Sequence, residues 1–392
     1  MEPNSAVVVT GQQIGVGWTP ALSVAKALAA LATARQLGGR AVYWMADEDH
    51  DRLEVSLTVG FDGDRLVRHR FHFEAPQGTA TGWLPWTETQ QALAESLWGD
   101  IPPATEPSLR GHVLALGRPL WRLGLEAFSP THPGLREPIQ SELARWRSLG
   151  LEAHLMKQAE HLEAEGQELV LDPRKQAAWF SLDPRNGLRR ALAEGEACPP
   201  GCWLSPGAAL RPLMQSLLLK ATHVVLGPSE RLYWQLTEPL WDLVDLAPPE
   251  IIARPSVYVL PRGLDIAPSQ LQALRHGYWE AFPFELPGIL PTGALAGLRP
   301  DPAWGPELIQ RFNQTLAQTR RKLIKLDRRF HRDLAGQILG MDPERLRQFL
   351  FPLSLPQERV LPGILWLQDE ALLARILEGL AQPAEVVLVE AS

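Results

Sequence analysis

The stretch from Val7 to Asp51 constrains the fold more than any other part of this chain. It opens with a short apolar run at 6–10 and passes through a glycine-bearing loop into an Ala/Leu-rich segment at 20–37, whose apolar residues have helical spacing. A second apolar run follows at 41–46. A strand, a loop, a helix and a strand in this order predict a βαβ unit with parallel strands and a right-handed crossover.

Both predicted strands end in polar residues, Thr10-Gly11-Gln12-Gln13 and Glu48-Asp49-His50-Asp51. Ligands of such units bind beyond the carboxyl ends of the strands, where loop amides and a helix N-terminus attract anions. The glycine loop lacks the spacing of the dinucleotide fingerprint and of the P-loop. Its glycines therefore indicate either an anion site or a tight turn, and the paired amides of Gln12 and Gln13 favour a ligand.

The cluster Glu48–Asp51 holds three acids and one histidine in four positions. Alternation along an extended chain predicts that Asp49 and Asp51 face one way and Glu48 and His50 the other. Acid–base work or binding of an amine is favoured over a metal site, because no other histidine–carboxylate group has ligand spacing. The structural alternative is a solvated strand end followed by a helix cap.

Composition limits the class of protein. The 392 residues are 45% hydrophobic and 21% charged, as in a globular protein of two or three domains. A net charge of −7 argues against a protein built mainly to bind nucleic acid. With no leader-like start and no apolar run of membrane length, we expect a cytoplasmic protein without membrane contact. Cys198 and Cys202 are expected to be reduced and structural.

The middle of the chain predicts further elements of an α/β core. Alternation around an Asp-Gly turn predicts a hairpin over Glu54–Phe73. Short runs between 151 and 171 are typical of small inserted hairpins. The other expected elements are helices at 88–98, 109–123, 138–149 and 205–221, and strands at 123–129, 222–226, 250–253 and 256–260.

A long helix is predicted from Trp304 to Ile338, with a near-heptad apolar stripe that needs a partner. The segment Ser269–Trp279 or another subunit could supply it. The basic run Arg320–Arg332 lies on the same helix, so an exposed coiled-coil face is favoured over an RNA-binding surface. The predicted organisation is a core at 1–128 and 205–261, an inserted connecting segment at 129–204, a helical arm at 262–345 and a C-terminal segment at 346–392 that returns to the core.

Five ordered blocks in this chain resemble the bacillithiol-biosynthesis cysteine-adding enzymes. They are T-G-Q-Q-x-G with Pro20 and Lys26, Y-W-M-A-x-E-D-H-D at 43–51, S-P-x-x-x-L-R-P-x-x-Q at 205–215, L-G-P-x-E-x-x-Y-W at 226–234, and P-Q-E-R-V at 356–360. Their order along the chain makes the resemblance specific, although each block alone is weak.

The resemblance implies a Rossmann-like core similar to nucleotidyltransferases and class I synthetases, with inserted segments and a dimerising coiled-coil arm that is shortened here. It implies that the carboxyl of cysteine is joined to the amine of glucosaminyl-malate, the last step of bacillithiol synthesis. ATP (or ADP) would bind as a substrate, with no metal beyond Mg²⁺ carried by ATP. The implied partners are these small molecules and a second copy of the chain, with no nucleic acid and no membrane.

The resemblance also implies site residues by position. Glu48, Asp49, His50 and Asp51 would be catalytic, and Arg211 would suit a carboxylate such as the malyl group. The residues expected to bind substrate or nucleotide are Thr10, Gly11, Gln12, Gln13, Gly15, Lys26, Arg211, Gln215, Gly227, Glu230, Tyr233 and Arg359.

Two other functions stay open at this stage. One is a related ATP-dependent ligase with another amine acceptor or acyl donor. The other is a non-catalytic scaffold that binds RNA or protein through the basic face Arg320–Arg332.

Overall fold

The computed structural model describes residues 5–62, 65–264, 266–276, 295 and 297–391. The chain divides into two compact units, which we call the core unit (Met1–Val259 with Glu358–Ser392) and the inserted unit (Leu260–Gln357). Within the described residues, no helix combines the length and the apolar character that crossing a membrane requires.

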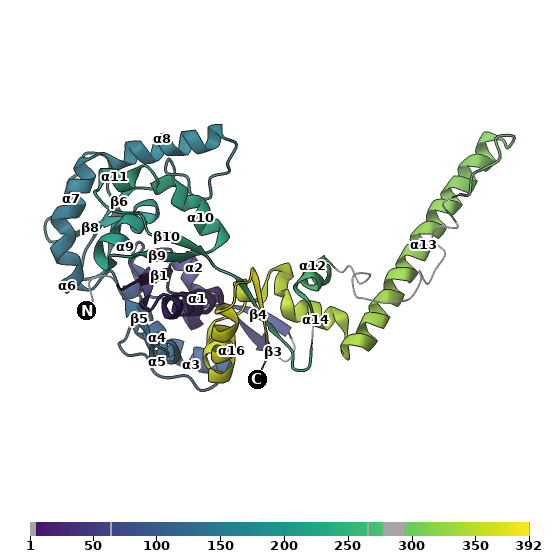
Figure 1. Ribbon diagram of the computed structural model, residues 1–392, viewed down its shortest axis with the longest axis horizontal. Helices are drawn as coiled ribbons and strands as arrows, with labels where there is room; N and C mark the ends of the chain where they lie inside the picture. The colour runs from purple at the N-terminus through teal and green to yellow at the C-terminus, as the bar shows by residue number, and fades with distance from the viewer. Residues whose placement is uncertain (1–4, 63–64, 265, 277–294, 296, 392) are drawn as a thin grey trace. The chain divides into compact units, whose positions relative to one another are not determined.

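The core unit is built on a sheet of five parallel strands in the order β10-β9-β1-β2-β5 (Figure 1). Helix α1 (Leu22–Gln36) connects β1 to β2, so the predicted βαβ unit is present. The predicted α/β class with a parallel core sheet is confirmed. The strands are β1 (Val7–Gln12), β2 (Arg40–Met45), β5 (Leu125–Phe128), β9 (His223–Leu226) and β10 (Glu250–Ala253).

The order of the strands reverses beside β1. The chain runs outward from β1 through β2 to β5, and then returns to place β9 and β10 on the other side of β1. The boundary between β1 and β9 is therefore the switch point, where open α/β sheets bind their ligands.

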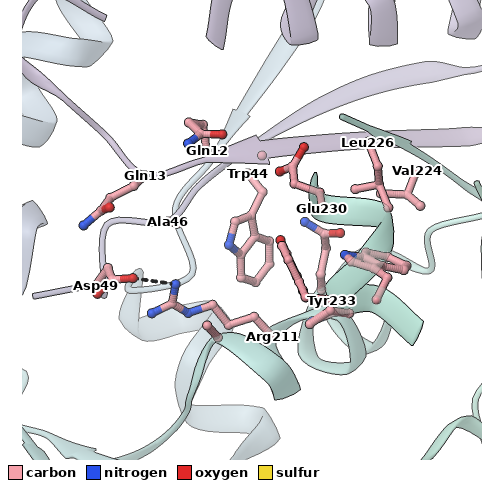
Figure 2. A pocket seen from close by; sticks show the side chains of 15 residues that line it. Gln12, Gln13, Trp44, Ala46, Asp49, Arg211, Val224, Leu226, Glu230 and Tyr233 are labelled. Carbon is pink, nitrogen blue, oxygen red and sulfur yellow. Dashed lines mark hydrogen bonds and ion pairs between the residues drawn. The ribbon is translucent and has the colours of Figure 1, made fainter. Parts of the chain in front are cut away.

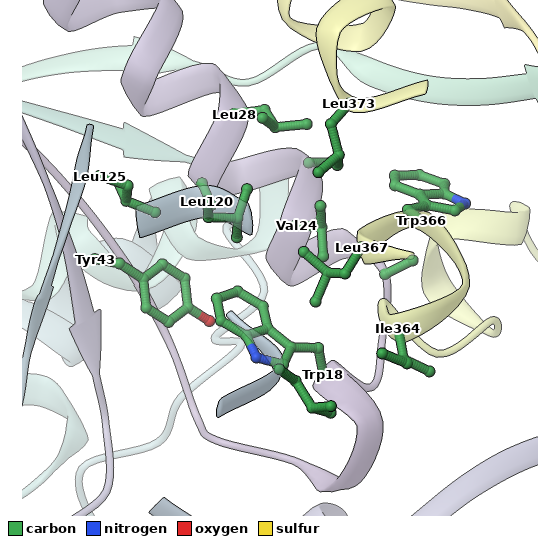
Figure 3. Close-up of a cluster of buried hydrophobic side chains, with 14 of the residues drawn as sticks. Trp18, Val24, Leu28, Tyr43, Leu120, Leu125, Ile364, Trp366, Leu367 and Leu373 are labelled. Atoms are coloured by element: carbon green, nitrogen blue, oxygen red, sulfur yellow. The ribbon is translucent and has the colours of Figure 1, made fainter. Parts of the chain in front are cut away.

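Side chains alternate between two buried faces of this sheet, as the period of a strand requires. Val8 and Tyr43 join one hydrophobic cluster, whereas Val9 and Trp44 join the other. On the first face, side chains of α1 lie beside those of the C-terminal helices α15 (Ile364–Leu367) and α16 (Glu370–Leu380) (Figure 3). The second cluster takes in α7 (Gln140–Ser148), α8 (Leu151–Ala164), α9 (Arg211–Leu219) and α11 (Leu240–Leu243).

Several predicted elements differ from the structure in type or length. The hairpin is β3 (Leu57–Asp62) with β4 (Arg65–Arg70), because Asp51 caps a short helix α2 (Arg52–Ser56) before it. The region 151–164 is one helix, α8, and not small hairpins. The remaining short helices of the core unit are α3 (Glu88–Trp98), α4 (Leu109–Leu116), α5 (Arg118–Arg122), α6 (Pro133–Arg136) and α10 (Pro228–Trp234).

A small antiparallel sheet follows the region in which hairpins are predicted and begins within the predicted inserted segment. Its order is β7-β6-β8, with β6 (Trp179–Leu182), β7 (Arg189–Ala191) and β8 (Trp203–Pro206). Ser205 and Pro206 thus end a strand, and the helix predicted from Ser205 begins only at Arg211, with proline in its first turn. The strand expected at 256–260, β11 (Ser256–Leu260), pairs with β12 (Val386–Glu390) outside the main sheet.

The inserted unit contains α12 (Pro268–His276), α13 (Pro306–Leu339) and α14 (Pro343–Leu350). The long helix α13 agrees with the prediction for 304–338 and ends at Gly340, whose φ of 65° is left-handed. Its Leu308, Leu326 and Phe330 are exposed. The coiled coil and the dimer stay predictions, and residues 277–279 of the expected partner segment lie outside the described residues.

A buried histidine lies in the core beside the glycine loop. His112 of α4 is fully buried and stacks on Trp86, with 3.6 Å between the ring centroids. Its Nε2 accepts a hydrogen bond of 3.3 Å from the backbone N–H of Gly17. Burial lowers the pKa of His112 to about 3, so the ring is neutral in the folded protein.

Because the pKa of His112 is lowered in the folded protein, we expect the protein to become less stable toward unfolding in mild acid. Below pH 6.5 His112 is protonated in the unfolded chain but stays neutral in the folded protein. The free energy of unfolding therefore falls as the pH falls from 6.5 toward 3. The slope is roughly 1.4 kcal/mol per pH unit. We expect His112→Gln to flatten this slope in urea titrations between pH 7.5 and 5, whereas His161→Gln, a change of an exposed histidine, should keep it. Equal slopes in wild type and His112→Gln would contradict the assignment.

Candidate functional site

A cavity of about 190 Å³ lies at the switch point between β1 and β9, and we call it the first cavity (Figure 2). Its walls come from the end of β1 and the residue that follows it, from β2 and the turn after it, from β9, and from α9 and α10. The lining residues are Gly11, Gln12, Gln13, Trp44, Ala46, Asp49, Ala208, Arg211, Pro212, Gln215, Val224, Leu226, Glu230, Tyr233 and Trp234.

An ion pair forms one side of this cavity. Arg211 is the first residue of α9, and its Nη1 donates to Asp49 Oδ2 at 2.8 Å (Figure 2). Burial opposes the ionised form of Asp49, but Arg211 and Arg189 outweigh it and hold the pKa of Asp49 well below its usual range. Among the described residues, the second terminal nitrogen of Arg211 has no hydrogen-bond partner, so this donor is left for a ligand.

Glu48 is a buried hub behind the ion pair. Its Oε2 accepts from Arg136 Nη2 at 2.9 Å and from Ser205 Oγ at 2.9 Å, and its Oε1 lies 3.5 Å from Arg211 Nε. The side chains of Glu48 and Arg136 are both fully buried. Burial acts to raise the pKa of Glu48, but the surrounding arginines prevail and lower it. Glu48 therefore stays ionised and positions Arg211, and it does not line the cavity.

His50 faces away from the first cavity. Arg189, itself 1% exposed, donates from Nη1 to His50 Nδ1 at 3.1 Å and lies 3.7 Å above the ring of Phe180. Burial and the charge of Arg189 lower the pKa of His50. His50, Asp49 and Asp51 line a second cavity of about 410 Å³, which also touches Arg211.

Lys26 of α1 contacts three residues that line the first cavity. Its ammonium is fully buried and donates to Glu230 Oε1 at 2.5 Å, to Gln12 Oε1 at 3.2 Å and to the carbonyl of Gly11. Glu230 in turn accepts from the N–H of Gly227 at 2.8 Å, capping α10. Burial lowers the pKa of Lys26 while Glu230 opposes that shift. These contacts hold the end of β1 against α10.

Asp47 anchors the loops beside the cluster. It is fully buried and accepts from Ser129 Oγ at 2.6 Å, from Thr131 Oγ1 at 3.1 Å and from Arg110 Nη1 at 3.5 Å. Burial raises the pKa of Asp47 to about 6. It contacts neither cavity, so its role is to hold the turn from which Glu48 and Asp49 project.

The structure gathers most of the predicted site residues around the first cavity and places the others elsewhere. Thr10 is buried and donates to the carbonyl of Val225, and Arg359 is exposed on the surface. A side chain at Gly15 would meet the carbonyl of Thr19 at 2.5 Å, so this glycine serves a close backbone approach. The predicted residues that line the first cavity are Gly11, Gln12, Gln13, Asp49, Arg211, Gln215, Glu230 and Tyr233.

The predicted alternation of the acidic cluster is wrong. The chain turns at Asp47 and Glu48 instead of continuing as a strand. Asp49 and His50 therefore reach the same second cavity, while Glu48 points into the protein. Asp51 accepts from the backbone N–H groups of Leu53 and Glu54 and caps α2, as the structural alternative for this cluster proposed.

Sequence reasoning missed several residues of the site. Arg136 and Arg189 contact Glu48 and His50 from 88 and 139 residues away, and no local pattern marks them. Trp44 and Trp234 belong to two of the recognised blocks and could have been found there. In the described part of the chain, no three His, Cys, Asp or Glu residues gather as a metal site would need.

A parallel α/β sheet with a polar, partly aromatic cavity at its switch point is the arrangement of a Rossmann-like enzyme that binds small molecules. Residues 1–107 match the family described as "Bacillithiol biosynthesis BshC, N-terminal Rossmann-like domain". The chain is similar to this BshC family over its N-terminal part, in agreement with the resemblance of its sequence blocks.

Relatives with the name "Putative cysteine ligase BshC" match most of the chain. Two of them come from different strains of Thermus thermophilus. One is 28% identical over 91% of this chain and 82% of its own length, and the other is 26% identical with the same coverage. The relative from Solibacter usitatus is 28% identical over 61% of this chain and 52% of its own. The name of these relatives is that of a ligase, the enzyme class predicted from the sequence.

Proposed function

We propose that this chain forms an amide between the carboxyl of L-cysteine and the amine of glucosaminyl-malate, as the last step of bacillithiol biosynthesis, with ATP as the activating substrate. Its similarity to BshC proteins supports the class, a cysteine ligase of bacillithiol biosynthesis. The observation that supports these substrates is the Asp49–Arg211 pair in the wall of the first cavity.

The pair offers two complementary charges to the reactants. The free donor of Arg211 suits a carboxylate, such as that of cysteine or of the malyl group. Asp49 keeps a low pKa, so it is suited to hold an ammonium group and poorly suited to remove its proton near neutral pH. The rings of Trp44, Tyr233 and Trp234 give the same cavity apolar wall area for a base or a sugar.

The reaction needs a leaving group that the carboxylate lacks. Attack of the cysteine carboxylate on ATP would give cysteinyl-adenylate and pyrophosphate, and attack of the amine would then form the amide, release AMP and leave one proton to solvent. A phosphate route would release ADP and phosphate instead. Both routes use one ATP for each amide bond.

Product analysis by mass spectrometry tests this proposal. We expect the purified protein with cysteine, glucosaminyl-malate, ATP and Mg²⁺ to accumulate the cysteinyl amide, and to make none when ATP is left out. The nucleotide formed, AMP or ADP, distinguishes the two routes. Absence of the amide in the complete mixture, with the folded state verified by circular dichroism, would contradict the proposal.

A further inference from the structure

The second cavity adjoins the first, because the two cavities share part of their walls. Its wall includes Asp49, Ala208 and Arg211, which also line the first cavity, so the Asp49–Arg211 pair stands between the two. A group in either cavity therefore reaches this pair, each from its own side. The remaining lining residues of the second cavity are His50, Asp51, Lys175, Gln176, Ala177, Phe180, Arg189 and Ala191.

The hydrogen bond from Arg189 fixes the state of His50. A guanidinium can only donate, so Nδ1 of His50 must be the acceptor in their 3.1 Å contact. The proton of the neutral ring is then on Nε2. Arg189 is locked in this orientation, because it also donates to the carbonyl of Pro206 at 2.8 Å and to Ser205 Oγ at 3.3 Å. His50 therefore offers an N–H donor and has no free lone pair for a base.

Both acids around His50 already accept hydrogen bonds, whereas Nε2 of His50 has no partner among the described residues. Asp49 binds Arg211 and the backbone N–H of His50, and Asp51 caps α2 through Leu53 and Glu54. Lys175 also lines this cavity, and its side chain is 82% exposed. Among the described residues its ammonium pairs with Asp172 alone, at 3.2 Å. The groups left for a ligand are thus the Nε2–H of His50, the Lys175 ammonium and the guanidinium of Arg211.

We propose that the second cavity is an oxyanion site, which binds a carboxylate or phosphate group of one reactant through His50 Nε2–H and Lys175 and presents that reactant to the Asp49–Arg211 pair. His50 acts there as a hydrogen-bond donor and not as a general base. The identity of the reactant rests on the proposed function, whereas the preference for an oxyanion does not.

Binding of simple anions tests the site without turnover. Titration of the full chain with inorganic phosphate and with L-malate in a calorimeter would measure the affinity for each anion. His50→Leu should weaken binding roughly tenfold or more, since a hydrogen-bond donor of the cavity wall is lost, and His50→Gln should keep most of the affinity through its amide. Lys175→Ala should weaken it about two- to fivefold, as expected for an exposed charge. A preference for malate or for phosphate tells which group the site takes.

Two matched controls separate this cavity from the rest of the surface. Ala191→Trp places a ring in the second cavity and should abolish binding, whereas Ala193→Trp, on an exposed neighbour outside it, should not. Lys157→Ala removes an exposed lysine of α8 and should leave the affinity unchanged. Anion binding that is equal in Ala191→Trp and wild type would overturn the proposal.

The tautomer of His50 gives a second readout. In ¹⁵N spectra of imidazole-labelled protein, the resonances that His50→Gln removes should show a protonated Nε2 and an unprotonated Nδ1, and phosphate should shift them. A protonated Nδ1 would overturn the donor role. Failure of the amide assay together with intact anion binding would reject the proposed function but not the oxyanion site. Amide formation without anion binding in the second cavity would reject the oxyanion site but not the proposed function.

Discussion

Arg211→Ala should lower kcat/KM for amide formation by roughly thirty- to a thousand-fold. The guanidinium lies in the wall of the first cavity, and one of its terminal nitrogens has no partner among the described residues. Its loss also removes the ion-pair partner of Asp49 and one of the arginines beside Glu48. Removing one side of a buried, charged hydrogen bond costs about 2–4 kcal/mol, which corresponds to that range. Steady-state rates with each substrate varied in turn would measure the loss.

The control for Arg211→Ala is Arg231→Ala, a change of an exposed arginine on neighbouring α10. Its rates should equal those of the wild type. Arg211→Lys should recover only part of the lost rate, because an ammonium cannot present the planar pair of donors. Full activity of Arg211→Ala would refute the placement of the reaction beside the Asp49–Arg211 pair.

Glu48→Ala should lower the free energy of unfolding by about 3–5 kcal/mol, the cost of breaking a buried ion pair on one side. Arg136 would remain fully buried with its charge uncompensated, and Ser205 would lose its acceptor. The arginines that now surround Glu48 would also repel one another. Urea unfolding followed by circular dichroism would measure the change in midpoint and slope.

Glu137→Ala is the matched control for Glu48→Ala, because this glutamate is exposed and follows Arg136 directly in the chain. It should change stability by less than about 0.5 kcal/mol. If Glu48→Ala has the same urea midpoint as the wild type, the contacts of Glu48 with Arg136 and Ser205 do not stabilise the fold as argued.

Local patterns made much of the sheet predictable. The strand–loop–helix–strand unit followed from its apolar runs, and the bounds of α3 coincide with the predicted helix at 88–98. The helix α8 also carried a local signal, since Leu151, Leu155 and Ala159 recur every four residues and all are buried. The short apolar runs in this stretch predict hairpins only if this four-residue period is ignored, and the prediction of hairpins is therefore wrong.

The polar contacts of the site were less predictable, because they join distant parts of the chain. The sequence predicts a functional role for the cluster Glu48–Asp51, but which of its members reaches a cavity depends on the turn at Asp47 and on the arginines that pair with it. Arg189 lies in a strand of the small antiparallel sheet, and nothing near it in the sequence points to His50. A motif identifies such residues; the tertiary fold assigns their contacts.

The bidentate pair between Arg254 and Glu358 has a consequence for how this chain tolerates changes in length. Arg254 donates to both carboxylate oxygens of Glu358, at 2.8 and 2.9 Å, and the N–H of Val257 donates to the same group. These residues lie just before the chain leaves the core unit and at its return. The two chain segments that lead into and out of the inserted unit are thus joined within the core unit. We therefore expect the core unit to tolerate insertions and deletions within Leu260–Gln357, and even replacement of this inserted unit by a short linker, without loss of the pairing of β10 in the main sheet.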